Sequence, residues 1–281
     1  MLKPEDYKGQ TPAWCMGCGN FGILNAFKAA VLELGIEPHQ FTIVSGIGQA
    51  GKFPHYLKCN TFNGLHGRTL PVATGIRLAN HEMLTIAVSG DGDCYGEGGN
   101  HLMHAMRRNV NVKLFVHDNQ IYGLTKGQAS PTSPEGMITK NQPFGVFSEQ
   151  LNPIALAVAL DCSFAARGFA GDMEPLKGLI KAAINHKGFS LVDILQPCVT
   201  FNKINTYEWY RQRVYRIEPE YNPEDRAEAF KRALEWGERI PIGIIYKNNR
   251  LTLEERIPII QNEPLVRHKH FPSKNLLFKS E

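Results

Sequence analysis

Two short turns carry the residue types that bind a metal ion and a phosphate group. Asp91 lies in a Gly-Asp-Gly-Asp turn at residues 90–93, and Asn119 follows Asp118 later in the chain. Carboxylate and amide oxygens suit Mg²⁺, which prefers oxygen ligands and usually completes its shell with phosphate oxygens. Gly92 lets the backbone approach a diphosphate, whose charge the N-terminus of a following helix also favours. The two turns together predict a site for Mg²⁺ and a diphosphate.

The segments around these turns are typical of a strand–helix–strand unit. An apolar run at 84–88 leads into the first turn, and apolar residues alternate from 112 to 116 before the second. Between them, Leu102, Ala105 and Met106 have the spacing of one helix face, within a helix expected over 100–108. Such a unit predicts a parallel sheet with a right-handed crossover. Both turns then lie at the carboxyl ends of strands, where ligands bind in sheets of this kind.

Cys15 and Cys18 form a Cys-x-x-Cys motif just before a helix that is predicted over 21–34. Two thiols at this spacing can share a metal ion or a cluster, and a turn with two free thiols is equally compatible with the motif. A zinc site needs two further Cys or His ligands, and the sequence has no second Cys-x-x-Cys. In a reducing compartment, six cysteines indicate metal or redox chemistry before disulfides.

Other segments supply weaker candidates. A strand predicted at 41–45 ends in a Gly-rich loop, after which Lys52 is either a contact for an anionic substrate or a solvated charge. His66, before a helix predicted at 69–80, is either a cofactor contact or a structural residue. Residues 126–145 are rich in Pro, Gly, Ser and Thr, which is typical of a functional or mobile loop. The remaining patterns predict helices at 153–160, 174–185 and 223–236 and strands at 161–166 and 190–195.

The bulk composition is that of an ordinary globular protein. With 281 residues, the chain can form one large α/β domain or two small ones. The formal net charge of +4 fits an acidic partner or an unremarkable surface, and no basic tract interleaved with aromatic residues favours nucleic acid. No run reaches the roughly 18 apolar residues of a membrane helix, and the N-terminal residues have no apolar signal segment. We therefore expect a cytoplasmic protein that binds neither membrane nor nucleic acid.

Taken together, these motifs resemble the β subunit of two-subunit 2-oxoacid:ferredoxin oxidoreductases, the family of pyruvate and 2-oxoglutarate synthases. The resemblance extends over nearly the whole chain and rests on long motifs: WCxGCG, SGIG, LHGR-x-LPVATG, GDGD…GGNH…HAMRRN, DNQIYGLTKGQ-SPT, QPC-TFN and IPIGIIY. It implies an α/β thiamine-diphosphate-binding fold of the diphosphate-binding type, with a parallel sheet and helices on both faces. Residues 1–200 are then the cofactor-binding domain, and residues 201–281 a C-terminal extension that packs on the core or on a partner subunit.

The resemblance also implies roles for individual residues. Mg²⁺ would be held by Asp91, Asn119 and the carbonyl group of Ile121. Lys52 matches a family lysine that meets the 2-oxoacid. The residues implied around the diphosphate are Gly92, Asp93, Gly123 and Leu124. The residues implied around the thiamine are Gly19, Gly46, Ile47, Gly48 and His66.

A [4Fe-4S] cluster is also implied, with Cys15, Cys18 and Cys198 matching three of its four cysteine ligands. At the fourth position the family has cysteine and this chain has Gln49. Iron in such clusters is bound by thiolate, and a neutral glutamine is a poor ligand. Four outcomes stay open: Cys59 substitutes as the fourth ligand, three thiolates hold a cluster with a labile iron, a [3Fe-4S] cluster forms, or no cluster is present.

The implied reaction is oxidative decarboxylation of a 2-oxoacid, either 2-oxoglutarate or pyruvate, with coenzyme A. It yields acyl-CoA and CO₂ and passes electrons to ferredoxin. Because the chain has only one domain of the diphosphate-binding type, we expect it to be active only with an α subunit that carries the pyrimidine-binding domain. The sequence leaves open which 2-oxoacid and electron acceptor are used and the stoichiometry of the assembly.

Three alternatives come from other classes of function. Gln49 alone supports a cluster-free, non-oxidative decarboxylase or carboligase subunit. The intact acidic turns argue against a non-catalytic subunit that merely scaffolds an α subunit. A nicotinamide-dependent dehydrogenase is disfavoured, since no GxGxxG motif opens a first strand–helix–strand unit.

Overall fold

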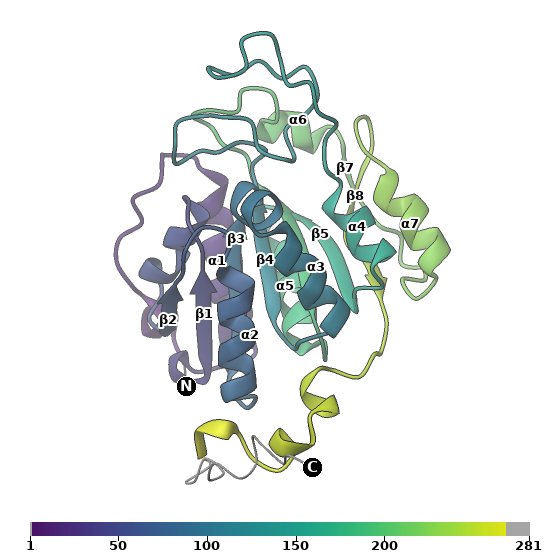
Figure 1. Ribbon diagram of the computed structural model, residues 1–281. Coiled ribbons are helices and arrows are strands. Elements are labelled where there is room, and N and C mark those ends of the chain that lie inside the picture. The colour runs from purple at the N-terminus through teal and green to yellow at the C-terminus, as the bar shows by residue number, and fades with distance from the viewer. Residues whose placement is uncertain (1, 268–281) are drawn as a thin grey trace, which may run out of the picture.

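One eight-stranded sheet runs through the computed structural model, which describes residues 2–267 (Figure 1). The strand order is β2-β1-β3-β4-β6-β5-β8-β7. In chain order the strands are β1 (Phe41–Ser45), β2 (Asn60–Asn63), β3 (Leu84–Gly90), β4 (Lys113–Asp118), β5 (Phe164–Phe169), β6 (Ser190–Leu195), β7 (Val214–Arg216) and β8 (Ile240–Lys247). The helices are α1 (Gly19–Glu33), α2 (Thr69–Ala79), α3 (Gly99–Arg108), α4 (Pro153–Ala159), α5 (Met173–Asn185), α6 (Tyr207–Arg211) and α7 (Arg226–Leu234).

The sheet is parallel from β2 to β5 and changes direction once, at its C-terminal edge. The pairs among β1 to β6 are all parallel. β8 runs antiparallel to β5, and β7 pairs with β8 in parallel. The segment after residue 200 therefore adds two strands to the same sheet, and its last residues, 268–281, lie outside the described part of the chain.

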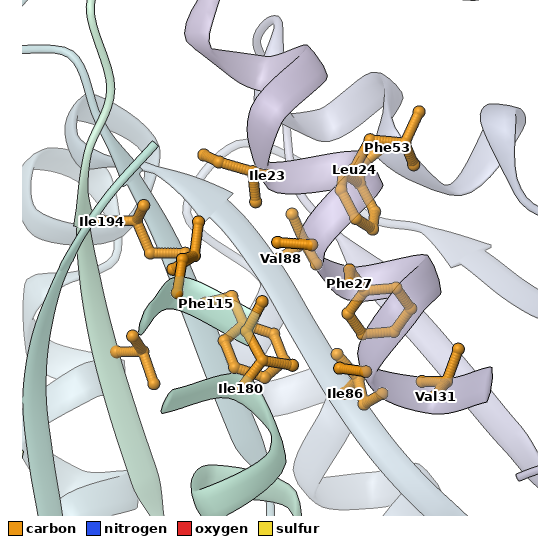
Figure 2. Close-up of a cluster of buried hydrophobic side chains, with 14 of the residues drawn as sticks. Ile23, Leu24, Phe27, Val31, Phe53, Ile86, Val88, Phe115, Ile180 and Ile194 are labelled. Atoms are coloured by element: carbon orange, nitrogen blue, oxygen red, sulfur yellow. The ribbon is translucent and has the colours of Figure 1, made fainter. Parts of the chain in front are cut away.

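Helices α1 and α5 cover one face of the sheet. Figure 2 shows the contact, in which Ile23, Phe27 and Val31 of α1 meet side chains from the central strands, among them Ile86 and Phe115. All of these side chains are at most 2% exposed. Because both faces of the central strands are buried, their sequences are nearly continuous apolar runs.

The opposite face packs against α2, α3, α4 and α7. Its core includes Leu70 from α2, Leu102 from α3, Ile154 from α4 and Ala229 from α7. The sheet is thus covered by helices on both faces, as the sequence predicts. No helix among residues 2–267 is long and apolar enough to cross a membrane.

Several predicted boundaries differ from the structure. β5 begins at Phe164 and not at residue 161, because Asp161 adopts a left-handed conformation (φ 56°) that ends the preceding turn. α7 begins after Asp225, whose side chain accepts hydrogen bonds from the amides of Ala227 and Glu228 and caps the helix. The Gly-rich turn after β3 continues as a π-helical segment, Gly92–Glu97, before α3.

Candidate functional site

The loops that follow β1, β3 and β4 meet at the carboxyl edge of the sheet and enclose a pocket. We call it the aspartate pocket. It unites Asp91, Asn119 and the backbone of Ile121 with most of the residues that the sequence predicts around a cofactor. Its lining comprises Ile47, Gly48, Gln49, Ala50, His66, Gly90, Asp91, Gly92, Asp93, Asn119, Ile121, Tyr122, Gly123, Leu124 and Thr125.

Asp91 is buried and held by two hydroxyl groups. Its Oδ2 atom accepts hydrogen bonds from Ser130 Oγ at 2.5 Å and from Thr132 Oγ1 at 2.7 Å. The side chain is only 2% exposed, and burial raises the pKa of its carboxyl group. Both hydroxyls use the same oxygen, so that Oδ1 has no hydroxyl partner among residues 2–267. A cation beside Oδ1 would compensate the buried charge.

The backbone after β4 turns sharply to place Asn119 and Ile121. Asn119 Oδ1 accepts the amide hydrogen of Ile121 at 3.0 Å, and Asn202 Nδ2 donates to the carbonyl oxygen of Asn119 at 3.1 Å. Gln120, between them, is left-handed with φ 58° and fully buried. Strained non-glycine conformations of this kind often mark functional sites. The turn therefore brings Asn119 and Ile121 to the pocket that Asp91 also lines.

The carboxylate of Asp93 contacts residues from several loops of the site. Its Oδ1 atom accepts hydrogen bonds from the amides of Ile47 (3.1 Å) and Gly67 (2.8 Å) and lies 3.0 Å from Nδ1 of His66. Its Oδ2 atom accepts a short hydrogen bond from the Ser89 hydroxyl. This carboxylate, 3% exposed, thus fixes the loop after β1 and the turn before α2 against the π-helical segment.

Two glycines of the pocket occupy positions where a side chain is disfavoured. A Cβ atom on Gly92 would lie 2.3 Å from the ring of Tyr122, which itself lines the pocket, so glycine lets this ring pack against the turn. Gly48 has φ 120°, a conformation that L side chains rarely adopt, and nothing lies within 4 Å of its Cβ position. The backbone at Gly48 is therefore open to close approach by a ligand.

Three predicted residues do not line the aspartate pocket. A Cβ atom on Gly46 would lie 1.9 Å from Asp93 Oδ2, and one on Gly19 would lie 2.8 Å from Gln196, so each glycine permits close packing against that side chain. Lys52 lies in a 3₁₀ segment, Ala50–Tyr56, and is partly exposed. Its ammonium group has no hydrogen-bond or ion-pair partner within the described part of the chain.

A second pocket contains the three predicted cluster thiols. We call it the thiol pocket. Cys15 and Cys18 reach it from the segment before α1, and Cys198 reaches it from the segment after β6. Gln196 Nε2 lies 3.5 Å from Cys18 Sγ, and burial raises the pKa of the Cys18 thiol to about 11. The lining comprises Ala13, Trp14, Cys15, Cys18, Asn20, Gln49, Asn119, Gly123, Gln196, Cys198, Val199, Thr200 and Phe201.

The donor set of the thiol pocket suits a cluster better than a single ion. No three Cys, His, Asp or Glu side chains in residues 2–267 converge as ligands of one metal ion. An iron–sulfur cluster needs no such convergence, because each thiolate binds a different iron atom. Three thiols from two separate chain segments around one pocket therefore fit a cluster.

Cys59 lies outside the thiol pocket. It directly precedes Asn60, which pairs with Thr42 at the start of β1, whereas Gln49 follows the end of that strand. The length of β1, about 13 Å at 3.3 Å per residue, separates the two ends. Burial raises the pKa of the Cys59 thiol to about 12. Gln49, and not Cys59, is thus the residue that lies with the three thiols in this structure.

The two pockets share a wall. Gln49, Asn119 and Gly123 line both of them. A Cβ atom on Gly123 would lie 4.0 Å from Cys198 Sγ and 3.9 Å from Asn119 Nδ2. The carboxyl ends of β1 and β4 therefore supply residues to both pockets.

Sequence reasoning missed the residues that hold the acidic turns in place. Ser130 and Thr132 belong to the long segment after β4, whose composition and Ser-Pro-Thr motif mark a functional or mobile loop but do not indicate contacts with Asp91. The sequence motif includes Trp14 but gives it no role: its indole N–H donates to the carbonyl oxygen of Gln49 at 2.8 Å and links the Cys15 segment to the loop after β1. Contacts of this kind join distant segments and leave no periodic pattern in the sequence.

Comparisons with known proteins identify the family of the chain. Residues 43–194 match the family model "Thiamine pyrophosphate enzyme, C-terminal TPP binding domain", and residues 198–262 match the C-terminal family model of the "Pyruvate ferredoxin oxidoreductase beta subunit". A 2-oxoacid:ferredoxin oxidoreductase subunit beta from Sulfolobus sp is 47% identical over 95% of this chain and 91% of its own length. The corresponding subunit from Saccharolobus solfataricus is 46% identical over 87% of this chain and 85% of its own length.

A solved structure is similar over almost the whole chain. It is the 2-oxoglutarate:ferredoxin oxidoreductase from Magnetococcus marinus with 2-oxoglutarate, coenzyme A and succinyl-CoA bound, and its TM-score is 0.92 at 37% identity. The match covers 98% of this chain and 95% of the other. The fold, the two pockets and the extent of these matches lead to one conclusion: the chain belongs to the family of thiamine-diphosphate-binding β subunits of 2-oxoacid:ferredoxin oxidoreductases.

Proposed function

We propose that this chain binds thiamine diphosphate with Mg²⁺ in the aspartate pocket and an iron–sulfur cluster in the thiol pocket. With an α subunit, it catalyses oxidative decarboxylation of a 2-oxoacid, 2-oxoglutarate or pyruvate, to acyl-CoA and CO₂. Electrons pass to ferredoxin. The observation that supports this proposal most strongly is the shared wall between a magnesium-type donor set and three thiols.

The magnesium ligands are Asp91 Oδ1, the Asn119 side-chain oxygen and the carbonyl oxygen of Ile121. All are oxygen donors of the kind that Mg²⁺ selects, and all three residues line the same pocket. Ser130 and Thr132 orient the Asp91 carboxylate through its other oxygen, as second-layer partners of a metal ligand do.

The remaining residues of the aspartate pocket position the organic cofactor. The diphosphate lies against Gly92, Asp93, Gly123 and Leu124. Gly19, Gly46, Ile47, Gly48 and His66 lie around the thiamine, with Gly46 packed against Asp93 and Gly19 against Gln196. When bound, thiamine diphosphate supplies the carbon nucleophile that attacks the keto group of the substrate.

Lys52 acts on the substrate. Its unpaired ammonium group lies in the 3₁₀ segment that directly follows Gln49, a residue of the shared wall. A charge without an internal partner is available to pair with the carboxylate of a 2-oxoacid or to polarise its carbonyl group. The exposed hydrophobic side chains of Leu65 and Leu124 flank the same loops and fit coverage by the α subunit, which brings the pyrimidine-binding domain and excludes water.

Reconstitution with the α subunit tests the proposal. The complex is expected to release CO₂ from a 2-oxoacid and to reduce ferredoxin only when coenzyme A is present, while the isolated chain does neither. CO₂ release without reduction of ferredoxin would instead support a non-oxidative decarboxylase. Comparison of pyruvate with 2-oxoglutarate in the same assay identifies the substrate.

A further inference from the structure

One residue that lines the thiol pocket has a buried polar atom without a partner. Oε1 of Gln49 is buried, and no hydrogen-bond donor of residues 2–267 reaches it. The same side chain lines the pocket together with Cys15, Cys18 and Cys198. Buried carbonyl oxygens are nearly always paired, so an unpaired one requires an explanation.

The backbone of Gln49 is firmly held, which limits where its side chain can go. Its carbonyl oxygen accepts the Trp14 indole hydrogen at 2.8 Å, and Trp14 packs edge-on against Phe21 and Tyr56. The same carbonyl oxygen accepts from the amide of Lys52 at 3.4 Å. Trp14 precedes Cys15 directly, so one hydrogen bond sets the position of Gln49 relative to the first thiol.

The thiol pocket contains no fourth cysteine. Cys59 lies at the far end of β1, Cys94 lines a different pocket beside Asp93, and Cys162 is a buried residue of the opposite core. Three thiols therefore meet at this place, and among the side-chain oxygens of the pocket lining only Oε1 of Gln49 is both buried and without a partner in the described chain.

We propose that the carboxamide oxygen of Gln49 binds the one iron atom of the cluster that has no cysteine ligand. This inference rests on the cluster proposed above. A carboxamide oxygen is neutral and holds iron less firmly than a thiolate, so this iron differs from the other three: it exchanges and is lost first. Because Gln49 also lines the aspartate pocket, the distinct iron faces the thiamine cofactor.

The neutral ligand also changes the charge of the cluster. A core of charge 2+ with four thiolates carries a net charge of 2−, whereas three thiolates and a carboxamide give 1−. Net charge is among the factors that set the reduction potential of iron–sulfur clusters. The less negative cluster accepts an electron more readily, so its reduction potential is higher than that of a four-cysteine cluster in the same pocket.

The test uses the αβ complex purified without oxygen, with Gln49→Cys, Gln49→Glu and Gln49→Leu variants and Cys198→Ser as a control. Iron and sulfide per chain, the EPR spectrum and the midpoint potential are measured for each complex. Thiamine diphosphate binding shows whether each variant has folded. We expect wild type, Gln49→Cys and Gln49→Glu to contain four irons, with the potential highest in wild type because the other two ligands are anionic.

Oxidation by ferricyanide tests whether the fourth iron is distinct. Ferricyanide takes one electron from the 2+ cluster, and the resulting 3+ cluster releases Fe²⁺ to leave a [3Fe-4S] cluster of charge 1+. We expect this loss in wild type and not in Gln49→Cys. In wild type with ¹³C-labelled glutamine carboxamides, the reduced cluster should show a hyperfine coupling to ¹³C that disappears in Gln49→Leu.

The outcomes distinguish failure of the proposal that Gln49 is a ligand from failure of the proposal that a cluster is present. Four irons with no ¹³C coupling, and with equal potential and iron loss in wild type and Gln49→Leu, would overturn Gln49 as a ligand and leave the cluster in place. A wild-type complex that contains no iron, while it still binds thiamine diphosphate, would overturn both the cluster and this inference.

Discussion

The hydroxyl oxygen of Thr132 lies 2.7 Å from Oδ2 of Asp91. It also lies 2.8 Å from Oδ1 of Asp118, so that one hydroxyl group joins the acidic residues of two separate turns. Thr132 is completely buried, and no water can take its place without a change in packing. The loop after β4 thereby fixes the position of Asp91 in the proposed magnesium site.

Removal of this hydroxyl should weaken metal binding more than it weakens the fold. Thr132→Val keeps the volume and leaves Asp91 with Ser130 as its remaining hydroxyl partner. Loss of such second-layer contacts typically costs about 10- to 100-fold in metal affinity. Titration of Mg²⁺ in the presence of thiamine diphosphate, followed by calorimetry, measures the effect. Thr132→Ser retains the hydroxyl and should bind Mg²⁺ nearly as wild type does; equal weakening in both variants would contradict the role.

Gly92→Ala should abolish or strongly weaken cofactor binding. The added methyl group would lie 2.3 Å from the ring of Tyr122. This contact would force the ring to move, and Tyr122 lines the aspartate pocket. Gly99, at the start of α3, is a matched control because nothing lies within 4 Å of its Cβ position. Gly99→Ala should leave binding unchanged and stabilise the protein by about 0.4–1 kcal/mol. Thermal unfolding and thiamine diphosphate titration distinguish the two, and normal binding by Gly92→Ala would refute the steric argument.

His117 should make the protein less stable in acid. Its Nδ1 atom donates to Asn20 Oδ1 at 2.7 Å, and complete burial lowers its pKa to about 3. An unfolded histidine has a pKa of about 6.5, so below this pH the unfolded chain binds a proton that the folded chain does not. The free energy of unfolding should therefore be unaffected above pH 6.5 and fall by up to about 1.4 kcal/mol per pH unit between pH 6.5 and 3.

The His117→Asn variant isolates this contribution, because its amide nitrogen can still donate to Asn20 and does not titrate. Urea unfolding from pH 7 to pH 4 should show a smaller loss of stability for the variant than for wild type. Curves of equal slope would mean that His117 is not the group responsible.

The cysteines should fall into two classes when each is replaced by serine. Cys15→Ser and Cys198→Ser each remove a donor from the thiol pocket and should lower the iron content of the αβ complex sharply. Cys59→Ser alters the far end of β1 and should retain wild-type iron. Iron and acid-labile sulfide assays after anaerobic purification provide the comparison; loss of iron in Cys59→Ser alone would mean that the strand rearranges when the cluster binds.

The buried strands could be predicted from sequence, and the edge strand could not. The bounds of β1 and β6 agree with the predicted 41–45 and 190–195, since every residue in both strands is buried and both read as largely apolar runs. β2 is a short edge strand whose four residues are all exposed, and its sequence Asn-Thr-Phe-Asn has no apolar pattern. Apolar periodicity arises from burial of one face of an element, so it cannot predict an element that has no buried face.

The site likewise contains residues that could be predicted from the sequence and others that could not. The oxygen donors on the turns after β3 and β4 could be predicted, because strand ends can be located and their residue types are informative. The π-helical segment Gly92–Glu97 could not be predicted. Its hydrogen bonds join residues five apart, and the apolar spacing of 3.6 residues that identifies an α-helix does not detect them. The hydroxyls of Ser130 and Thr132 were hidden for another reason: they reach Asp91 from a loop about forty positions away, and only tertiary structure brings them together.

The wall formed by Gln49, Asn119 and Gly123 is one residue thick, since each of these residues faces both pockets. In the arrangement that we propose, an electron that leaves the aspartate pocket for the thiol pocket crosses only this wall, and all three residues belong to this chain. The proposed tunnelling distance would therefore be set when the chain folds and would not change with the way the partner subunit docks. Assembly would switch the chemistry on without altering the length of this proposed first electron-transfer step.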